Sequence, residues 1–131
     1  MINMNQAIHI LNTAQRSHAI HLSDNNIGDQ EAKYLAEQLK DSKHSHTIYL
    51  GRNNIGNQGA KYLAEQLKDS KHSHTINLSE NNIGDQGVED LKEMIESSKF
   101  PSYIILETDH LQQTIEGNDC LLYTSPSPRD A

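Results

Sequence analysis

"HTIYLGRNNIG", residues 46–56, recurs with few changes at two other places in the chain. Residues 18–28 read "HAIHLSDNNIG", and residues 74–84 read "HTINLSENNIG". The three stretches start 28 residues apart, and the complete units 18–45 and 46–73 are identical at 22 of 28 positions. Self-similarity at such a period indicates a solenoid of stacked structural units rather than one globular core.

Each unit changes its hydrophobic period halfway. Ile48 and Leu50 alternate with residues of the other face, which predicts a short strand with one buried side. The stretch "NNIG" at 53–56 predicts a turn. We expect Asn57 to cap the following helix. Apolar residues then recur at helical spacing, at Ala60, Leu63, Ala64 and Leu67.

Stacking such units predicts a curved array. Neighbouring parallel strands lie about 4.8 Å apart, whereas packed helices need about 8–10 Å. The helices must therefore spread along a convex outer face while the strands line a concave inner one. The sequence predicts an α/β horseshoe with a parallel sheet on its concave face and helices on its convex face.

The pattern IxLxxNxIGxxGAxxLxxxL, from Ile48 to Leu67, resembles the leucine-rich repeat of the 28-residue, ribonuclease-inhibitor-like subtype. That subtype also occurs in the sensing regions of NOD-like receptors and in bacterial effector-like proteins. The resemblance covers about residues 18–107. It implies that one asparagine in each unit hydrogen-bonds the backbone of neighbouring turns, at Asn25, Asn53 and Asn81. Asp109 holds the fourth such position and, when ionised, cannot donate a hydrogen bond.

The chain departs from the family pattern at two positions. The family's first leucine is a serine in every unit, at Ser17, Ser45 and Ser73. We therefore expect each layer to lose a buried side chain, worth about 1.5–3 kcal/mol. Glu31 stands where the later units have Gly59 and Gly87, so we expect that this position does not strictly require glycine.

Four segments follow from the repeat register. Residues 1–17 are expected to be a partial N-terminal repeat or cap, 18–101 three repeats, and 102–119 a partial fourth repeat or C-terminal cap. The ending "CLLYTSPSPRDA", 120–131, contains the one cysteine and resembles the conceptual translation of a transposase-based sequencing adapter. We expect this tail to be disordered, and the chain to be a fragment of a longer leucine-rich-repeat protein.

Composition restricts the function classes. Eighteen acidic and eleven basic residues give a net charge of −7, which argues against nucleic acid as a partner. No apolar run approaches the roughly 20 residues that span a bilayer, and no secretory signal is visible. We expect a monomeric, cytoplasmic protein that binds neither nucleic acid nor membrane. Secretion as an effector into a host cell is the alternative location.

The differences between the first two units indicate a recognition surface. Only six positions differ: 19/47, 21/49, 23/51, 24/52, 29/57 and 31/59. Four of these lie on or beside the outward face of the predicted strand, whereas exposed helix positions are copied unchanged. We predict a partner-binding surface on the concave face, formed by His21, Asp24, Tyr49, Arg52, Asn77, Glu80, Tyr103 and Ile105. Neighbouring positions complete the grid: Ala19, Thr47, Thr75, Ser23, Gly51, Ser79, Glu107 and Thr108.

No catalytic or cofactor motif stands out. The chain has no P-loop, no GxGxxG and no GxSxG, and we expect neither enzymatic activity nor a cofactor. Stacking places His18, His46 and His74 in one column, where neutral imidazoles could bind zinc or nickel. We favour a polar return loop, copied with the repeat, in which protonation near pH 6 loosens the array. The sequence thus favours a protein-interaction module, with a structural or regulatory spacer and a metal-binding histidine ladder as alternatives.

Overall fold

The computed structural model describes residues 3–107, 112–116 and 121–125, with side chains up to residue 106. Thr108, Asp109 and Cys120 lie outside the described residues. The elements, in chain order, are α1 (Met4–Thr13), β1 (Ala19–His21), α2 (Asp29–Lys40), β2 (Thr47–Tyr49), α3 (Asn57–Lys68), β3 (Thr75–Asn77), α4 (Asp85–Glu96), β4 (Tyr103–Glu107), β5 (Gln112–Glu116) and β6 (Leu121–Ser125).

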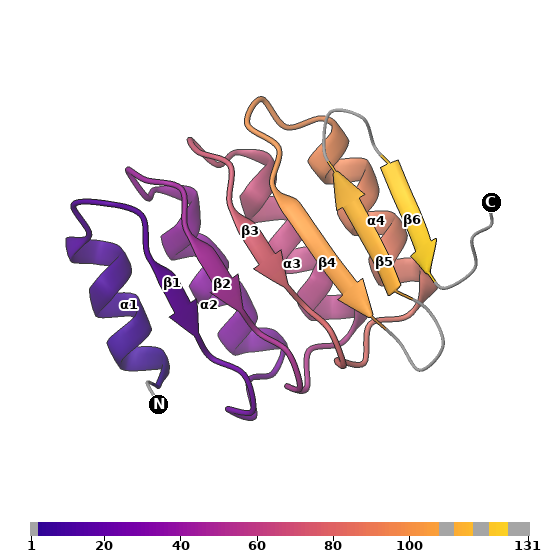
Figure 1. Cartoon of the computed structure of the whole chain (residues 1–131), viewed down its shortest axis with the longest axis horizontal. Helices are drawn as coiled ribbons and strands as arrows, with labels where there is room; N and C mark the ends of the chain where they lie inside the picture. The colour runs from indigo at the N-terminus through magenta and orange to yellow at the C-terminus, as the bar shows by residue number, and fades with distance from the viewer. Residues whose placement is uncertain (1–2, 108–111, 117–120, 126–131) are drawn as a thin grey trace.

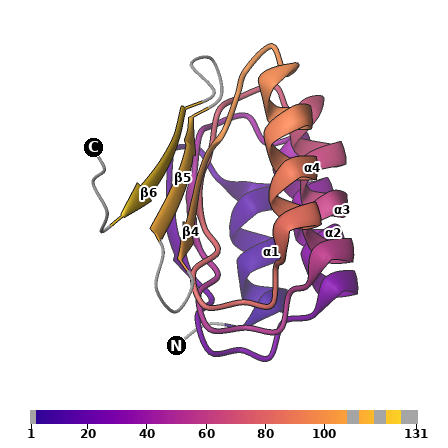
Figure 2. The same ribbon diagram turned by 90° about the vertical axis from the view of Figure 1, so that its right-hand side faces the viewer.

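The strands form one open sheet whose spatial order follows the chain from β1 to β6. β1 to β4 are parallel, and each residue pairs with the residue 28 positions later, as Ile20 does with Ile48. The helices cover one face of this sheet and leave the other uncovered (Figure 1, Figure 2). We call the uncovered side the open face. The predicted α/β solenoid, with a parallel sheet on one face and helices on the other, is therefore confirmed.

The C-terminal end of the sheet changes direction. β5 pairs antiparallel with β4, and β6 pairs antiparallel with β5. Within the tail 120–131, for which disorder was expected, the backbone of Leu121–Ser125 pairs with β5 as a strand. The physical reason is the free edge of β5, because unpaired backbone groups at a sheet edge accept a further strand.

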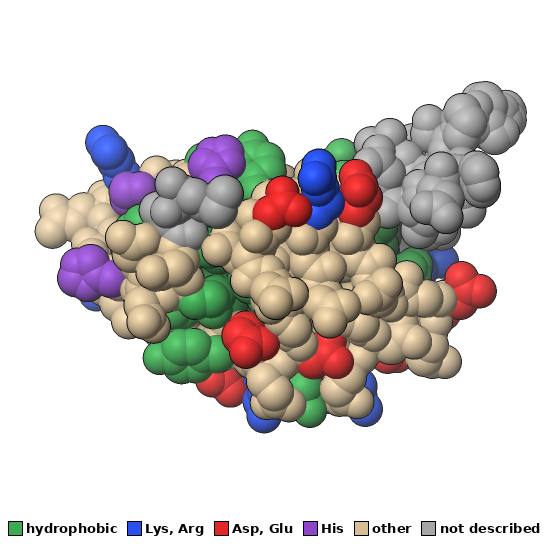
Figure 3. Space-filling model, turned by 90° about the horizontal axis from the view of Figure 1, so that it is seen from below, with side chains coloured by type: hydrophobic (Ala, Val, Ile, Leu, Met, Phe, Trp, Pro, Cys, Tyr) green, Lys and Arg blue, Asp and Glu red, His purple; other side chains and the backbone are tan. Residues whose placement is uncertain are grey.

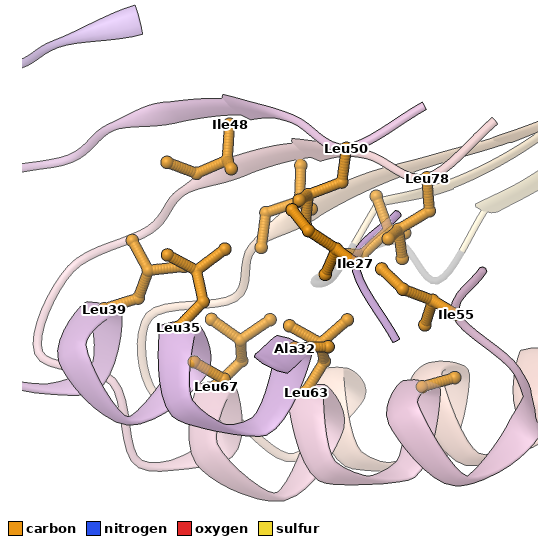
Figure 4. Packing of buried hydrophobic residues seen from close by; sticks show 14 of the residues in the cluster. Ile27, Ala32, Leu35, Leu39, Ile48, Leu50, Ile55, Leu63, Leu67 and Leu78 are labelled. Atoms are coloured by element: carbon orange, nitrogen blue, oxygen red, sulfur yellow. The ribbon is translucent and has the colours of Figure 1, made fainter. Parts of the chain in front are cut away.

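The core is a thin apolar layer between strands and helices. Two strand residues and one turn residue of each repeat point toward the helix leucines, as Figure 4 shows for Ile48, Leu50 and Ile55 opposite Leu63 and Leu67. These five side chains are fully buried. The same positions repeat in the neighbouring units, so that the clusters join into one continuous core.

The helices begin one residue earlier than the sequence indicated. The N-caps of α2, α3 and α4 are glycines, such as Gly56 before α3, and Asn57 is already the first helical residue. The side chain at this position bonds the next repeat instead of its own helix. Asp29 Oδ1 accepts the Gly56 N–H at 2.7 Å, and Asn57 Oδ1 accepts the Gly84 N–H at 2.7 Å. A cap residue inferred from local pattern is thus used for contact between repeats.

The glycine at the third helical position is required in the later repeats, contrary to expectation. A Cβ on Gly59 would lie 2.5 Å from Asp29 Oδ1 and 2.7 Å from Ile55 Cγ2. Glu31, at the same position in α2, instead uses its carboxylate to accept the Gly28 N–H at 3.0 Å. The glycine therefore makes room for the preceding repeat's linking side chain, which the sequence of a single unit does not reveal.

Asparagine amides join successive turns. Asn53 Oδ1 accepts the N–H groups of Asn25 and Ile27, both at 2.9 Å. Its Nδ2 donates to Leu22 O and Leu50 O, each at 3.0 Å. Each such amide satisfies backbone groups of two repeats at once, which matters because unpaired buried backbone groups are costly.

Asn81 continues this arrangement in the next layer. Its Oδ1 accepts the Ile55 N–H at 3.0 Å, and its Nδ2 donates to Leu50 O at 2.9 Å. Asn25, in the first repeat, donates to Ser23 O at 3.2 Å. We call Asn25, Asn53 and Asn81 the asparagine column.

Replacing Asn53 by alanine should destabilise the protein by about 2–4 kcal/mol, because it leaves the N–H groups of Asn25 and Ile27 and the carbonyl of Leu22 without this partner. Urea unfolding measures this loss. The matched control is Asn54→Ala, one residue further along the same turn, since Asn54 is exposed. Equal losses in the two variants would contradict a special role for the asparagine column.

Gly59→Ala tests whether this position requires glycine, because helix propensity and steric contact predict opposite changes in stability. Helix propensity alone predicts a gain of about 0.5–1 kcal/mol, whereas the close contacts predict a loss of about 1–3 kcal/mol. We expect the loss, measured by thermal or urea unfolding. Gln58→Ala, at the neighbouring exposed position, should change stability by less than about 0.5 kcal/mol.

Candidate functional site

The predicted grid residues occupy the open face in straight columns. The register places His21 beside Tyr49, Tyr49 beside Asn77, and Asn77 beside Ile105. The parallel column runs through Ala19, Thr47, Thr75 and Tyr103. β2 and β3 are paired on both sides and β1 is paired with β2, so the strand backbone fixes the positions of these side chains.

Two aromatic rings stack in the central column. The His21 and Tyr49 rings are nearly parallel, with centroids 4.6 Å apart and planes 4° from each other. His21 is exposed and Tyr49 half-buried. Further along, Asn77 Oδ1 accepts the Ser79 N–H at 2.9 Å, and Tyr103 is 36% exposed. The face thus combines flat apolar area with polar groups, a composition typical of protein-binding surfaces.

A charged row borders this face where the strands end. It comprises Asp24, Arg52 and Glu80, all of them exposed. Arg52 Nε lies 3.2 Å from Asp24 Oδ1, with both side chains more than half exposed, so the pair adds little stability. No ion pair among the described residues involves Glu80. Figure 3 shows acidic and basic side chains alternating along one edge, beside a histidine and a hydrophobic side chain.

The backbone of the charged row is in the left-handed region. The φ angles are 59° at Asp24, 56° at Arg52 and 56° at Glu80. Glycine, asparagine and aspartate tolerate this conformation, whereas arginine and glutamate are strained in it. Two of the three repeats therefore place a strained, long charged side chain where glycine would be more stable.

Two buried histidines precede the strands, and their burial was not predicted from the sequence. Ser45 and Ser73 are exposed, but the next residues, His46 and His74, are buried to 2% and 1% exposure. Each imidazole fills the layer position whose leucine seemed lost, so the expected deficit there is wrong. The burial of His46 could have been predicted from the sequence. His46, Ile48 and Leu50 alternate and therefore share one face of the strand.

The buried histidines are stacked and hydrogen-bonded. The His46 and His74 rings are 5.8 Å apart with planes 3° from parallel, and the His18 ring lies 5.9 Å from that of His46. His46 Nδ1 accepts the His18 N–H, and His74 Nδ1 accepts the His46 N–H, each at 3.0 Å. We call His18, His46 and His74 the histidine column. Its two buried members belong to the core and not to a polar loop.

In the part of the chain that the structure describes, no three His, Cys, Asp or Glu side chains form a group suited to a metal ion. The Nδ1 atoms of His46 and His74 already accept backbone N–H groups, so they have no free lone pair for a metal. Among the same residues, no helix is both long and apolar enough to cross a membrane.

Comparison with known proteins agrees with the repeat geometry. A family model described as Leucine Rich repeat matches residues 18–36, 46–64 and 74–92. Each match runs from the histidine before a strand into the following helix. These matches support a leucine-rich-repeat protein, and proteins built from such repeats commonly serve as interaction modules. A search of curated proteins found no match. The ribonuclease-inhibitor-like subtype stays a prediction.

The strain at Arg52 can be measured with two substitutions that both remove the charged side chain. We expect Arg52→Gly to be more stable than Arg52→Ala by about 1 kcal/mol, because only glycine accommodates this φ without strain. Urea unfolding of both variants gives the difference. At Lys61, an exposed position inside α3, the order should reverse by a similar amount. An alanine variant at residue 52 as stable as the glycine variant would contradict the strain.

Proposed function

We propose that the open face binds a protein partner, noncovalently and without a cofactor. The binding residues are His21, Asp24, Tyr49, Arg52, Asn77, Glu80, Tyr103 and Ile105. The leucine-rich-repeat matches support a role of this class. The net charge of −7 favours a protein over a nucleic acid as partner.

The observation that carries this proposal is the distribution of differences between the first two repeats. Two of the six differing positions, 29/57 and 31/59, have structural explanations, since Asp29 and Asn57 link helices and Glu31 and Gly59 differ in the space available. The other four positions, 19/47, 21/49, 23/51 and 24/52, all lie on the open face or its border. Variation confined to one exposed surface is expected where that surface recognises something.

The geometry suits recognition for two further reasons. The His21–Tyr49 stack offers a rigid aromatic patch, and aromatic side chains supply much of the binding energy at protein interfaces. Strained residues such as Arg52 and Glu80 commonly mark functional sites. Because Asp24 already pairs with Arg52, Glu80 provides the uncompensated charge of the row, which favours a basic group on the partner.

Two alternatives make different predictions. A structural or regulatory spacer would need the apolar stack but not the particular side chains of the open face. A metal-binding histidine ladder would need free ring nitrogens, and the two Nδ1 atoms bonded to the backbone argue against it. A zinc titration that raises the melting temperature at low micromolar metal would favour the ladder.

Site-specific photo-crosslinking tests which face meets a partner. A benzophenone amino acid at position 49, on the open face, should capture a protein from the source cells. The same probe at position 62, on α3, should not. Tyr49 and Tyr62 are both half-buried, so the two positions are matched in residue type and exposure.

Once a partner has been captured, Tyr49→Ala and Arg52→Glu should each weaken its binding about tenfold or more without lowering the melting temperature. Interferometry with purified partner measures the affinity, and Tyr62→Ala serves as the control. Unchanged affinity in both open-face variants would place the binding site elsewhere.

A further inference from the structure

The hydrogen bonds of the histidine column determine the protonation state of its buried rings. A backbone N–H can only donate, so the Nδ1 atoms of His46 and His74 must carry a lone pair and no proton. His74 Nε2 lies 3.1 Å from Leu39 O, which can only accept. The His74 ring is therefore neutral, with its proton on Nε2.

The same tautomer follows for His46. Its Nε2 lies 2.8 Å from Ser42 Oγ. The Ser42 hydroxyl donates its own proton to His44 O at 2.9 Å, which leaves the oxygen free to accept. Both buried rings thus accept with Nδ1 and donate with Nε2, and both must be neutral to do so.

Protonation of either buried ring would remove its hydrogen bond to the backbone of the preceding repeat. An added proton on Nδ1 faces the backbone N–H of the preceding repeat, so two donors would meet. For His46 this breaks the contact with His18 N, just before β1, and for His74 the contact with His46 N, just before β2. Two charged rings 5.8 Å apart would also repel each other.

The fourth layer shows a related contact without a titrating group. Ser102 Oγ accepts the His74 N–H at 3.1 Å. A hydroxyl therefore accepts the same backbone donor, so the imidazoles at positions 46 and 74 are not needed for the hydrogen bond as such. Compared with serine, histidine adds a larger buried side chain and sensitivity to protons.

The surroundings of the two rings oppose their charged form. Burial, and then neighbouring imidazoles, lower the pKa of His46, with His18, His44 and His72 contributing. Burial, with smaller contributions from His46 and His72, lowers the pKa of His74 to about 4, although the bond to Leu39 O acts in the opposite direction.

The charged groups in the adjoining return loops do not offset these effects. The nearest loop carboxylates in sequence, Asp41 and Asp69, are exposed. Asp41 Oδ1 lies 3.8 Å from Lys71 Nζ. The other cations of these loops, Arg16, Lys43 and Lys99, are exposed and carry the same sign as a protonated imidazole.

We propose that the histidine column is a proton-operated switch that holds β1, β2 and β3 in register when neutral and releases them in acid. The switch also regulates the open face, a second step that rests on the proposed function. His46 and His74 directly precede strands whose outward residues, such as Tyr49 and Asn77, form the binding grid. Loss of register between these strands would separate the grid residues.

The direction of the pH effect follows from proton linkage. An unfolded histidine binds its proton near pH 6.5, at its ordinary pKa, whereas folded His74 binds one only near its pKa of about 4. Between these values the unfolded state holds more protons, so the folding constant falls as pH falls. The decrease is about tenfold per pH unit for each neutral buried ring. It is absent above pH 7 and levels off below the folded pKa.

Urea unfolding of the full chain at pH 7, 6 and 5 tests the switch. The comparison variant is His46→Asn with His74→Asn, because the asparagine oxygen replaces Nδ1 as acceptor and does not titrate. From pH 6 to pH 5 the folding constant of the natural sequence should fall at least about tenfold more than that of the variant. The control, His44→Gln with His72→Gln, removes two partly exposed histidines and should keep most of the natural slope, because burial is the larger cause of the lowered pKa values. Equal slopes in the natural chain and the double asparagine variant would overturn the proposal.

A second measurement tests the protonation state of the two rings directly, even if the double variant fails to fold. Nitrogen-15 NMR of the imidazoles should show both rings neutral and protonated on Nε2 at pH 7. His74 should stay neutral down to pH 5.5, and the pKa of His46 should lie below the ordinary histidine value because of burial. Ordinary titration of both rings near pH 6.5 would overturn the switch.

The regulatory step has its own readout. Crosslinking yield from the probe at position 49 should drop between pH 7 and pH 5 in the natural column but not in the double asparagine variant. A yield independent of pH would overturn regulation alone. If position 49 captures nothing at any pH, the proposed function fails, while the unfolding slopes still decide the switch.

Discussion

The constraint on which this structure depends is the satisfaction of backbone groups in turns that lie against the core. Each strand of the repeats is only three residues long, so the sheet ladder binds few of the main-chain groups. The turns after the strands are partly buried, and unpaired main-chain groups are costly there. The amides of Asn53 and Asn81 supply them, each joining two repeats. The apolar layer holds a strand onto its helix, and the asparagine column holds one repeat onto the next.

The histidine column also joins successive repeats, at the point where the strands begin. His46 and His74 fill apolar layer positions and also accept a main-chain N–H from the preceding repeat. The strands are thus held at both ends by side chains of different chemistry, an amide that never titrates and an imidazole that does. Between these two columns lies the open face, whose side chains are free to vary because neither column uses them. The division explains how nearly identical repeats can carry different surface residues without losing the fold.

Much of the fold could be predicted from the sequence, because it depends on periodicity. Ile48 and Leu50 mark a strand, Leu63 and Leu67 a helix, and the 28-residue spacing gives the parallel register. Contacts between repeats were less predictable. The roles of Gly59 and Asp29 depend on the space between two units, and a single unit's pattern contains no information about it. The open-face residues lie in the predicted columns, but their role in binding is a matter for experiment, since a position on a surface does not identify its partner.

Amide hydrogen exchange, followed residue by residue by NMR, tests most directly whether side-chain columns hold the repeats together. The N–H groups of Ile27 and Ile55 bond only asparagine side chains, and that of His46 bonds the His74 ring. The account predicts that these amides are protected as strongly as the ladder amides of β2 and β3, because they open only when repeats separate. Exchange at the rate of an open loop, with the strands still protected, would show that the apolar layer alone holds the stack and would contradict the account.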